Sequence, residues 1–287
     1  MTSPASRLLT WYKRHGRDLP WRKTRDPYHI LVSEIMLQQT QVTRVLFFYE
    51  RWFTQFPDWK TLAKAENAEV IHAWAGLGYN RRGLMLRDIA RQIIEKGLPQ
   101  SEGAWRKLKG IGPYTAAALA AFSLKQRTLP IDTNIRRTVG RILLGIPFPQ
   151  PCDDETIQHH RDQILPKRGD YFDIPQALFD LATIICTKSP ECTVCPMKNA
   201  CEAAPKFLSG TIEVPKQMVK KAKETKHRNK PYPDRIYRGR ILKLVREQTT
   251  GVSLKHIGPN IDPDFKPTLD TLWVEAMIER LMKDGFL

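Results

Sequence analysis

The 287-residue sequence has no apolar run approaching the roughly 20 residues that cross a bilayer, so we expect no membrane-spanning helix. Its first residues, Met1 to Pro4, lack the basic segment and apolar core of a secretory signal. Cysteine is scarce, and four of the five cysteines stand close together. Such usage suits a reducing compartment, and we expect a cytoplasmic protein.

Acidic residues are also few. Thirty Asp and Glu against 46 Lys and Arg give a formal net charge of +16 and a pI near 9.7. An excess of this size indicates nucleic acid or an anionic membrane surface as partner. Because no membrane segment is expected, we favour nucleic acid. The length is sufficient for a substantial core and predicts two or three domains.

Segments that alternate with period two are rare, which disfavours a β fold. From residue 5 to about residue 205, apolar residues recur instead at spacings of three and four, as in 31–49 and 86–94. Prolines such as Pro27 and Pro57 separate these helical patterns. The sequence therefore predicts a mostly α fold.

A glycine-punctuated turn, LKGIGPYTAA at residues 108–117, leads into an alanine-rich run. Gly110 and Gly112 let the backbone approach a partner closely, because no Cβ stands in the way. Pro113 presets a helical turn, so that the N–H groups of Gly112, Tyr114 and Thr115 can point at an anion. Such a turn holds a phosphate diester without reading sequence. The alternative is an ordinary tight turn between two helices.

Four cysteines, Cys186, Cys192, Cys195 and Cys201, lie within one short segment. They are dense enough to ligate one [4Fe–4S] cluster. A zinc site and two disulfides are the alternatives. Zinc ribbons more often show two well-separated CxxC pairs, and this segment has one. Cys152 is left over and is interpreted as an ordinary thiol.

The turn at 108–117, followed by Asp132 in the segment IDTN, resembles the helix-hairpin-helix motif of a superfamily of DNA base-excision glycosylases. The blocks RDLPWR at 17–22, EIMLQQTQV at 34–42 and WAGLGY at 74–79 closely match the MutY adenine glycosylases. The resemblance runs from about residue 7 to residue 205. It implies a two-lobed glycosylase domain over 1–205, with a [4Fe–4S] cluster in a loop at 186–201 whose first cysteine gap is one residue short.

Two carboxylates match the catalytic positions of this family. Cleaving the bond between adenine and deoxyribose requires an acid for the base and a negative charge for the sugar cation, as in glycoside hydrolysis. The resemblance implies that Glu34, on an apolar helix, is the general acid and that Asp132 stabilises the sugar cation. Asn134 and Tyr114 match positions that hold this centre. Without the surrounding blocks, Glu34 would be interpreted as an exposed helix residue and Asp132 as a simple N-cap.

The target base must leave the duplex before it reacts. The resemblance implies that Gln39 and Tyr79 enter the duplex and that Thr40 lies near the opposite base. The residues that match the pocket for the extruded adenine are Arg17, Leu19, Trp21, Arg22 and Asp180. The alternative for Leu19 and Trp21 is hydrophobic core.

Tyr114 stands where strand-nicking relatives such as endonuclease III have a lysine that forms a Schiff base. A phenol does not form one, so we expect a monofunctional glycosylase that acts, as a monomer, on double-stranded DNA with a mispaired or damaged base. Adenine opposite guanine or 8-oxoguanine is the expected target. The alternatives are a thymine or uracil glycosylase for T:G and U:G mismatches, and a non-catalytic DNA-binding or damage-sensing protein.

The composition changes near residue 205. Between Lys216 and Arg240 there are ten Lys and Arg against two acids, which predicts a basic linker over 206–235. Apolar residues in 236–245, 254–257 and 269–283 predict three further helices, and the last five residues predict a tight turn into a terminal strand. We therefore expect a winged-helix-like DNA-binding domain over 236–287. This segment is too short and too helical for the Nudix-like domain with which MutY enzymes recognise 8-oxoguanine.

Overall fold

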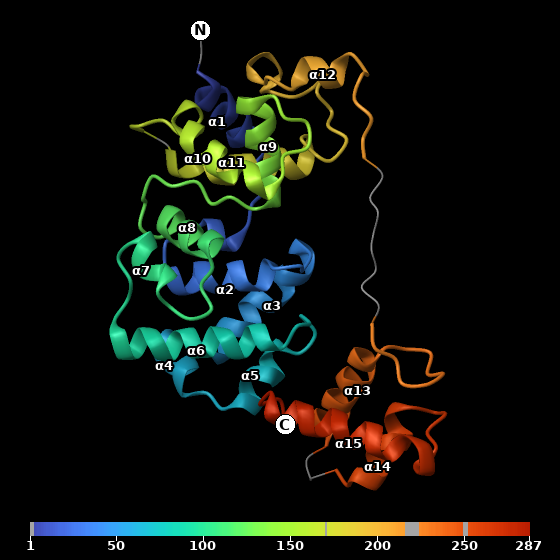
Figure 1. The fold of residues 1–287 in the computed structure, drawn as a ribbon. Helices are drawn as coiled ribbons and strands as arrows, with labels where there is room; N and C mark the ends of the chain where they lie inside the picture. Colours follow the sequence, from blue (N-terminus) through green and yellow to red (C-terminus); the bar gives the residue numbers. More distant parts are fainter. Residues whose placement is uncertain (1–2, 170, 216–223, 249–251) are drawn as a thin grey trace.

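The computed structural model describes residues 3–169, 171–215, 224–248 and 252–287, and these residues form helices and connecting loops (Figure 1). The mostly α fold predicted from the sequence is confirmed. The α-helices, in chain order, are α1 Pro4–His15, α2 Pro27–Leu37, α3 Val42–Gln55, α4 Trp59–Lys64, α5 Asn67–Trp74, α6 Arg81–Lys96, α7 Glu102–Arg106, α8 Pro113–Phe122, α9 Thr133–Leu144, α10 Asp154–His160, α11 Ile174–Ile184, α12 Ala204–Leu208, α13 Asp234–Glu247, α14 Leu254–Ile261 and α15 Pro267–Lys283.

The first lobe consists of α2 to α8, the blue-to-green layers of Figure 1, around one apolar core. Helix α2 begins where Asp26 caps the N–H of Tyr28 at 2.8 Å and Pro27 occupies the first turn. The Tyr28 hydroxyl then donates to the carbonyl of Phe56 at 2.7 Å. Eight of the eleven residues of α2 are buried, so the helix runs through the lobe and not along its surface.

The second lobe combines α1 from the start of the chain with α9, α10 and α11, which Figure 1 shows together above the first lobe. Helix α9 begins at the predicted place because Asp132 accepts the N–H groups of Asn134 and Ile135 at 2.8 and 2.7 Å. Phe179 on α11 packs against the cores of both lobes. The boundary between the lobes is therefore crossed by packed side chains.

The C-terminal domain is formed by α13, α14 and α15, coloured orange to red in Figure 1, around a core of its own. Its largest buried side chain, Tyr237, packs edge-on against Trp273. Beside this core, Lys230 forms ion pairs with Asp262 and Asp270 at 2.5 and 2.7 Å. The three predicted helices are confirmed, and part of the predicted linker, 216–223, lies outside the described residues.

The predicted terminal strand is wrong. Gly285 makes the expected turn, with φ +73°, but no strand follows it in the described part of the chain. The Gly285 carbonyl accepts a hydrogen bond from Asn67 on α5 at 2.7 Å, and the Phe286 ring packs against the cores of both the first lobe and the C-terminal domain. These contacts take the place of a strand partner.

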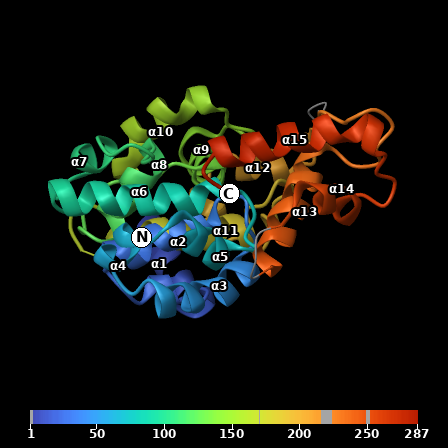
Figure 2. The same ribbon diagram turned by 90° about the horizontal axis from the view of Figure 1, so that it is seen from below.

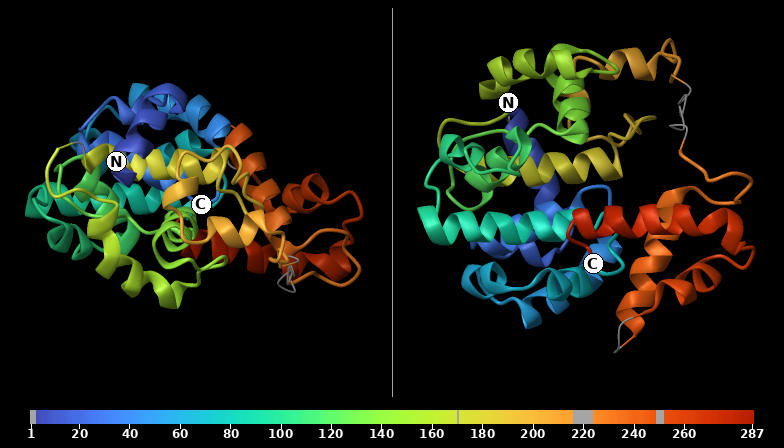
Figure 3. Two further views of the ribbon diagram at one scale, coloured as in Figure 1. Left: turned by 90° about the horizontal axis from the view of Figure 1, so that it is seen from above. Right: turned by 60° about the horizontal axis from the view of Figure 1, so that its bottom comes forward.

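The end of α15 also meets the first lobe through charge. Arg81, the first residue of α6, forms an ion pair with Asp284 at 2.7 Å. Figures 2 and 3 show the C-terminal end of the red helix α15 beside the beginning of α6. The C-terminal domain therefore docks next to the loop that carries Tyr79.

Candidate active site

Glu34 lies on α2 with 8% of its surface exposed, so it is not the exposed helix residue of the alternative interpretation. The pKa of its carboxyl is raised to about 7, chiefly by burial; a hydrogen bond from the Tyr114 hydroxyl lowers it, and the charge of Asp132 adds a smaller rise. A carboxyl with this pKa is partly protonated at neutral pH. It can therefore act as a proton donor.

Tyr114 occupies the first turn of α8 and connects the hairpin to the two carboxylates. Burial raises the pKa of its phenol well above the usual value, and the charges of Glu34 and Asp132 raise it further. The ring also contacts Phe179 of the second lobe, with 6.4 Å between ring centroids. Tyr114 thus stays a neutral hydroxyl at the junction of the two lobes.

The hairpin has the predicted form. Gly110 has φ +100°, and a Cβ there would meet Met85 at 2.8 Å, so this position requires glycine. At Gly112, the N-cap of α8, a Cβ would meet no atom of this chain within 4 Å. The first N–H groups of a helix have no intrahelical acceptor, so those of Tyr114 and Thr115 are available to an anion.

Asp132 and Asn134 form one unit at the start of α9. Besides its two backbone contacts, Asp132 accepts the Asn134 side-chain amide at 2.8 Å. The Asn134 oxygen in turn accepts from Arg137 at 3.1 Å, and Arg137 also donates to the carbonyls of Ala182 and Cys186. Asp132 is therefore held in one orientation, with a chain of contacts leading to the cysteine segment.

Gln39 and Tyr79 sit at the tips of two neighbouring loops and are both exposed, Tyr79 by 68%. Both have left-handed backbones, with φ +55° and +49°. Thr40 is partly buried, and its hydroxyl accepts from Arg82 at 3.2 Å. The structure thus places the three residues assigned to the opened duplex on loops that Arg82 connects.

The residues assigned to the adenine pocket fall into two groups: three form an ion-pair network, and the other two are buried. Arg17 and Arg22 both bind Asp180, whose side chain is fully buried, at 2.7 Å. Burial acts to raise the pKa of Asp180, but the hydrogen bonds and charges of the two arginines hold it below its usual range. Leu19 and Trp21 belong to the first-lobe core, as the alternative interpretation had it for these two residues.

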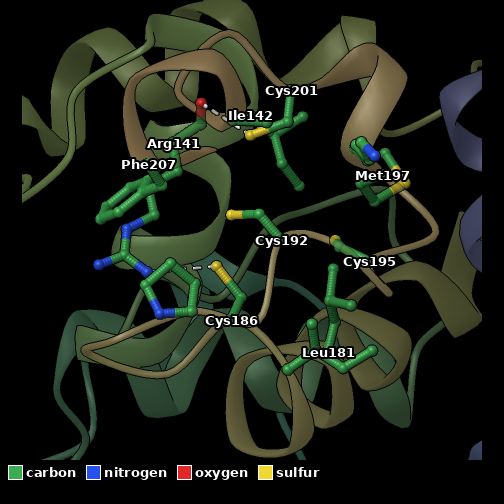
Figure 4. Close-up of a pocket in the computed structure, with 13 residues that line it drawn as sticks. Arg141, Ile142, Leu181, Cys186, Cys192, Cys195, Met197, Cys201 and Phe207 are labelled. Atoms are coloured by element: carbon green, nitrogen blue, oxygen red, sulfur yellow. Dashed lines mark hydrogen bonds between the residues drawn. The ribbon is translucent and has the colours of Figure 1, made fainter. Parts of the chain in front are cut away.

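The four clustered cysteines line one pocket (Figure 4). Burial raises the pKa of Cys195 to about 12. Backbone N–H groups of Met197 and of Ala203 and Ala204 bond to the sulfurs of Cys195 and Cys201, and Arg141 lies 3.5 Å from that of Cys186. In the described residues no three His, Cys, Asp or Glu side chains are close enough to hold a single metal ion. Hydrogen-bond donors that point at cysteine sulfurs stabilise thiolates, which are the negatively charged form in which cysteine binds a metal.

Three buried or half-buried arginines were missed by the sequence interpretation: Arg82, Arg137 and Arg141. Each donates mainly to backbone carbonyls, and Arg141 bonds those of Pro147, Thr187 and Lys188. The only signal in the sequence was an arginine at an otherwise apolar helical position. An arginine at such a position does not indicate which acceptors it will bond.

Residues 32–165 match the family model described as HhH-GPD superfamily base excision DNA repair protein. A solved thermostable thymine-DNA glycosylase superposes with a TM-score of 0.65 at 28% identity, over 70% of this chain and 95% of that chain. An endonuclease III in a non-covalent DNA complex superposes with a TM-score of 0.60 at 16% identity, over 73% and 100%, and shares the fold. Fold and site together define a protein of the HhH-GPD superfamily of base excision DNA repair proteins.

The adenine DNA glycosylase of Mycolicibacterium smegmatis is 33% identical over 290 residues, covering 97% of this chain and 94% of that enzyme. The enzyme of Mycobacterium tuberculosis is 38% identical over 197 residues, 66% of this chain and 64% of that enzyme. The human enzyme is 36% identical over 211 residues, 68% of this chain and 38% of that enzyme. The chain belongs to the family of adenine DNA glycosylases. It spans nearly all of the first relative and less than two thirds of the other two.

Among the described residues, none of the helices is both long and apolar enough to cross a membrane.

Proposed function

We propose that this chain is a monofunctional glycosylase that excises adenine mispaired with guanine or 8-oxoguanine from double-stranded DNA. The observation that carries the proposal is the buried carboxyl of Glu34, with a pKa near 7, next to Tyr114 and within the field of Asp132. Proton donation to the base by Glu34 makes adenine a better leaving group. The relationship to adenine DNA glycosylases is the reason for proposing adenine as the base that is released.

Asp132 supplies the second half of the reaction. When the glycosidic bond breaks, positive charge develops on the deoxyribose, and a carboxylate fixed beside it stabilises that charge. Asp132 is fixed because two backbone N–H groups and the Asn134 amide hold its oxygens. The sugar cation then takes a water molecule, and an abasic site remains.

Tyr114 supports a reaction without strand scission. Its phenol, kept neutral by burial, is not an amine and forms no Schiff base with the abasic sugar. The N–H groups of Gly112, Tyr114 and Thr115 hold the DNA backbone, while Gln39 and Tyr79 enter the space that the base leaves. The residues proposed to receive the extruded adenine are Arg17, Leu19, Trp21, Arg22 and Asp180.

A second candidate target is thymine or uracil opposite guanine, since a thymine-DNA glycosylase superposes on 70% of this chain. The deciding experiment incubates the protein with duplexes holding A:G, A:8-oxoG, T:G and U:G, with alkali added afterwards. Alkali-dependent breaks at adenine are expected. Breaks at thymine or uracil alone would support the second candidate, and strand breaks before alkali with a borohydride-trapped complex would contradict the monofunctional reaction. No product from any duplex would leave the non-catalytic DNA-binding interpretation.

The four cysteines Cys186, Cys192, Cys195 and Cys201 are proposed to hold a [4Fe–4S] cluster. Their placement around one pocket supports this, as do the N–H donors and Arg141, which would stabilise the thiolates. The cluster would supply a rigid link between the cysteine loop and α9. Arg137, which bonds the Cys186 carbonyl and Asn134, would transmit that rigidity to Asp132.

The C-terminal domain and the basic linker are proposed to add DNA affinity without sequence readout. Arg235, Arg238 and Arg280 line one pocket of this domain together with Trp273. Guanidinium groups beside an aromatic ring suit phosphate and an unstacked base. We further propose that the protein acts as a monomer in the cytoplasm, at the nucleoid if the cell is prokaryotic.

A further inference from the structure

Arg82, in the first turn of α6, joins the two loops that carry Gln39 and Tyr79. Its Nη1 donates to the carbonyls of Ile35, at 3.0 Å, and Gln38. Its Nη2 donates to the carbonyl of Gly78 at 3.1 Å and to the Thr40 hydroxyl at 3.2 Å. The guanidinium is buried, with 8% of the residue exposed.

The two carbonyls of Gln38 and Gly78 have a special position. Each belongs to the peptide unit that directly precedes a left-handed residue, Gln39 or Tyr79. The orientation of that peptide unit sets the φ angle of the residue after it. By bonding both carbonyls, the guanidinium therefore holds Gln39 and Tyr79 in the left-handed region of backbone conformation, which residues with a Cβ otherwise avoid.

The Arg82 guanidinium also contacts the ring of Tyr79, 5.5 Å from its centroid, and lies at the same distance from the buried Trp74. The Tyr79 ring therefore has a fixed contact on one side although 68% of the residue is exposed. A lysine does not replace this arrangement, because its ammonium group has three donors and no planar fork.

We infer that Arg82 is a positioning residue that sets Gln39 and Tyr79 as a preformed pair, so that both enter the duplex together and the target base is extruded faster. This inference rests on the proposed glycosylase function. It assigns Arg82 to the extrusion step and not to cleavage of the glycosidic bond, since Arg82 contacts neither Glu34 nor Asp132 through any hydrogen bond or ion pair found among the described residues.

The test compares Arg82→Lys with wild type in single turnover on two substrates. One is a duplex with an A:G mispair, and the other holds the same adenine in an unpaired bubble, where little extrusion is needed. On the duplex we expect the rate to fall by roughly 10- to 100-fold, as when one or both loop residues leave the left-handed region. On the bubble we expect nearly the wild-type rate, and on both substrates an unchanged pH dependence.

Arg87→Lys is the matched control, because Arg87 is a buried arginine of the same helix that bonds Ala65 and Asn67, away from both loops. Its rates on the two substrates should change in parallel. Arg82→Gln, which keeps one N–H donor group and loses the planar fork, gives the same comparison if Arg82→Lys does not fold, and it should slow the duplex reaction selectively.

An equal loss on duplex and bubble, or no loss on the duplex, would overturn the inference while leaving the proposed function intact. A wild-type protein that releases no base from either substrate would overturn both. Fluorescence of 2-aminopurine placed beside the target adenine gives a direct second readout, and its rise should be slower in Arg82→Lys.

Discussion

Glu34 on α2 and Asp132 at the start of α9 come from different lobes, yet the charge of Asp132 acts on the Glu34 carboxyl. Burial first, and the Asp132 carboxylate second, raise the pKa of Glu34 to about 7. A carboxyl with this pKa holds a proton near neutral pH and can donate it to a base. Contact between the two lobes adds the charge of Asp132 to the larger effect of burial.

The rate of base release should depend on pH through Glu34. The protonated carboxyl is the active form, so the single-turnover rate should be constant below pH 7 and fall tenfold per unit above it, with the midpoint near the pKa of about 7. Glu34→Gln should be slower by at least roughly 10²-fold and show no such midpoint, because the amide does not titrate. A wild-type rate that rises through this range would contradict the assignment of a general acid.

The stability of the fold should also depend on the protonation of Glu34, and it should decrease as pH rises. The folded protein binds this proton up to pH of about 7, whereas the unfolded chain loses it near 4.5. Stability of the wild type should therefore decrease as pH rises between these values, by up to about 3 kcal/mol. Urea unfolding should find Glu34→Gln more stable than wild type at pH 8, and the difference should shrink toward pH 4.5. A variant that is less stable at pH 8 would disprove this sign.

Asp132→Asn separates the catalytic charge from the helix cap. Asparagine caps a helix about as well as aspartate, so the start of α9 and the melting temperature should change little. Loss of the negative charge should nevertheless lower the rate by at least roughly 10²-fold. Single-turnover assays with thermal melts as control test this, and an active Asn variant would show that Asp132 is only a cap.

If the four clustered cysteines hold a [4Fe–4S] centre, substitution of Cys195 should remove iron and substitution of Cys152 should not. Purified protein should be yellow-brown and contain about four iron atoms per chain, as a [4Fe–4S] centre requires. Cys195→Ser should lose iron and colour, because Cys195 lines the shared pocket. Cys152→Ser is the control and should keep both, since Cys152 is exposed and outside that pocket. One zinc and no iron by metal analysis would rule the cluster out.

Substitution of three arginines tests whether the C-terminal domain adds DNA affinity. Replacing Arg235, Arg238 and Arg280 by Gln should weaken binding to all duplexes alike and reduce the salt dependence by up to roughly one unit of slope per lost phosphate contact. The order of preference among mispairs should persist, because the candidate site lies in the two lobes. The control replaces the exposed Lys60, Lys64 and Lys96 instead. Equal effects in both triple variants would indicate unspecific charge, and loss of discrimination between 8-oxoguanine and guanine would indicate a lesion reader.

Features that depend on local sequence could be predicted. The hairpin at 108–117, the cap at Asp132 and the three C-terminal helices follow from glycine, proline, capping residues and helical spacing, and the structure has them where the sequence indicated. The burial of Glu34 followed from the apolar residues on both sides of it.

Contacts across long stretches of chain could not be predicted. Arg82 bonds carbonyls 44 to 47 positions earlier in the sequence, and carbonyls are present at every residue, so no side-chain pattern marks them. The terminal strand failed for a related reason. Whether Phe286 continues as a strand depends on whether the Gly285 carbonyl finds a donor other than a strand partner, and Asn67 provides that donor from a distant part of the chain.

Phe286 packs against the cores of two bodies, the first lobe and the C-terminal domain. A ring that is shared in this way makes the two bodies thermodynamically dependent, because melting of either one removes packing from the other. Calorimetry should then find a single heat-absorption peak for the two, and not a separate early peak for the small domain. Through Phe286, together with the Asn67–Gly285 and Arg81–Asp284 contacts, the small helical domain then unfolds as one cooperative unit with the first lobe.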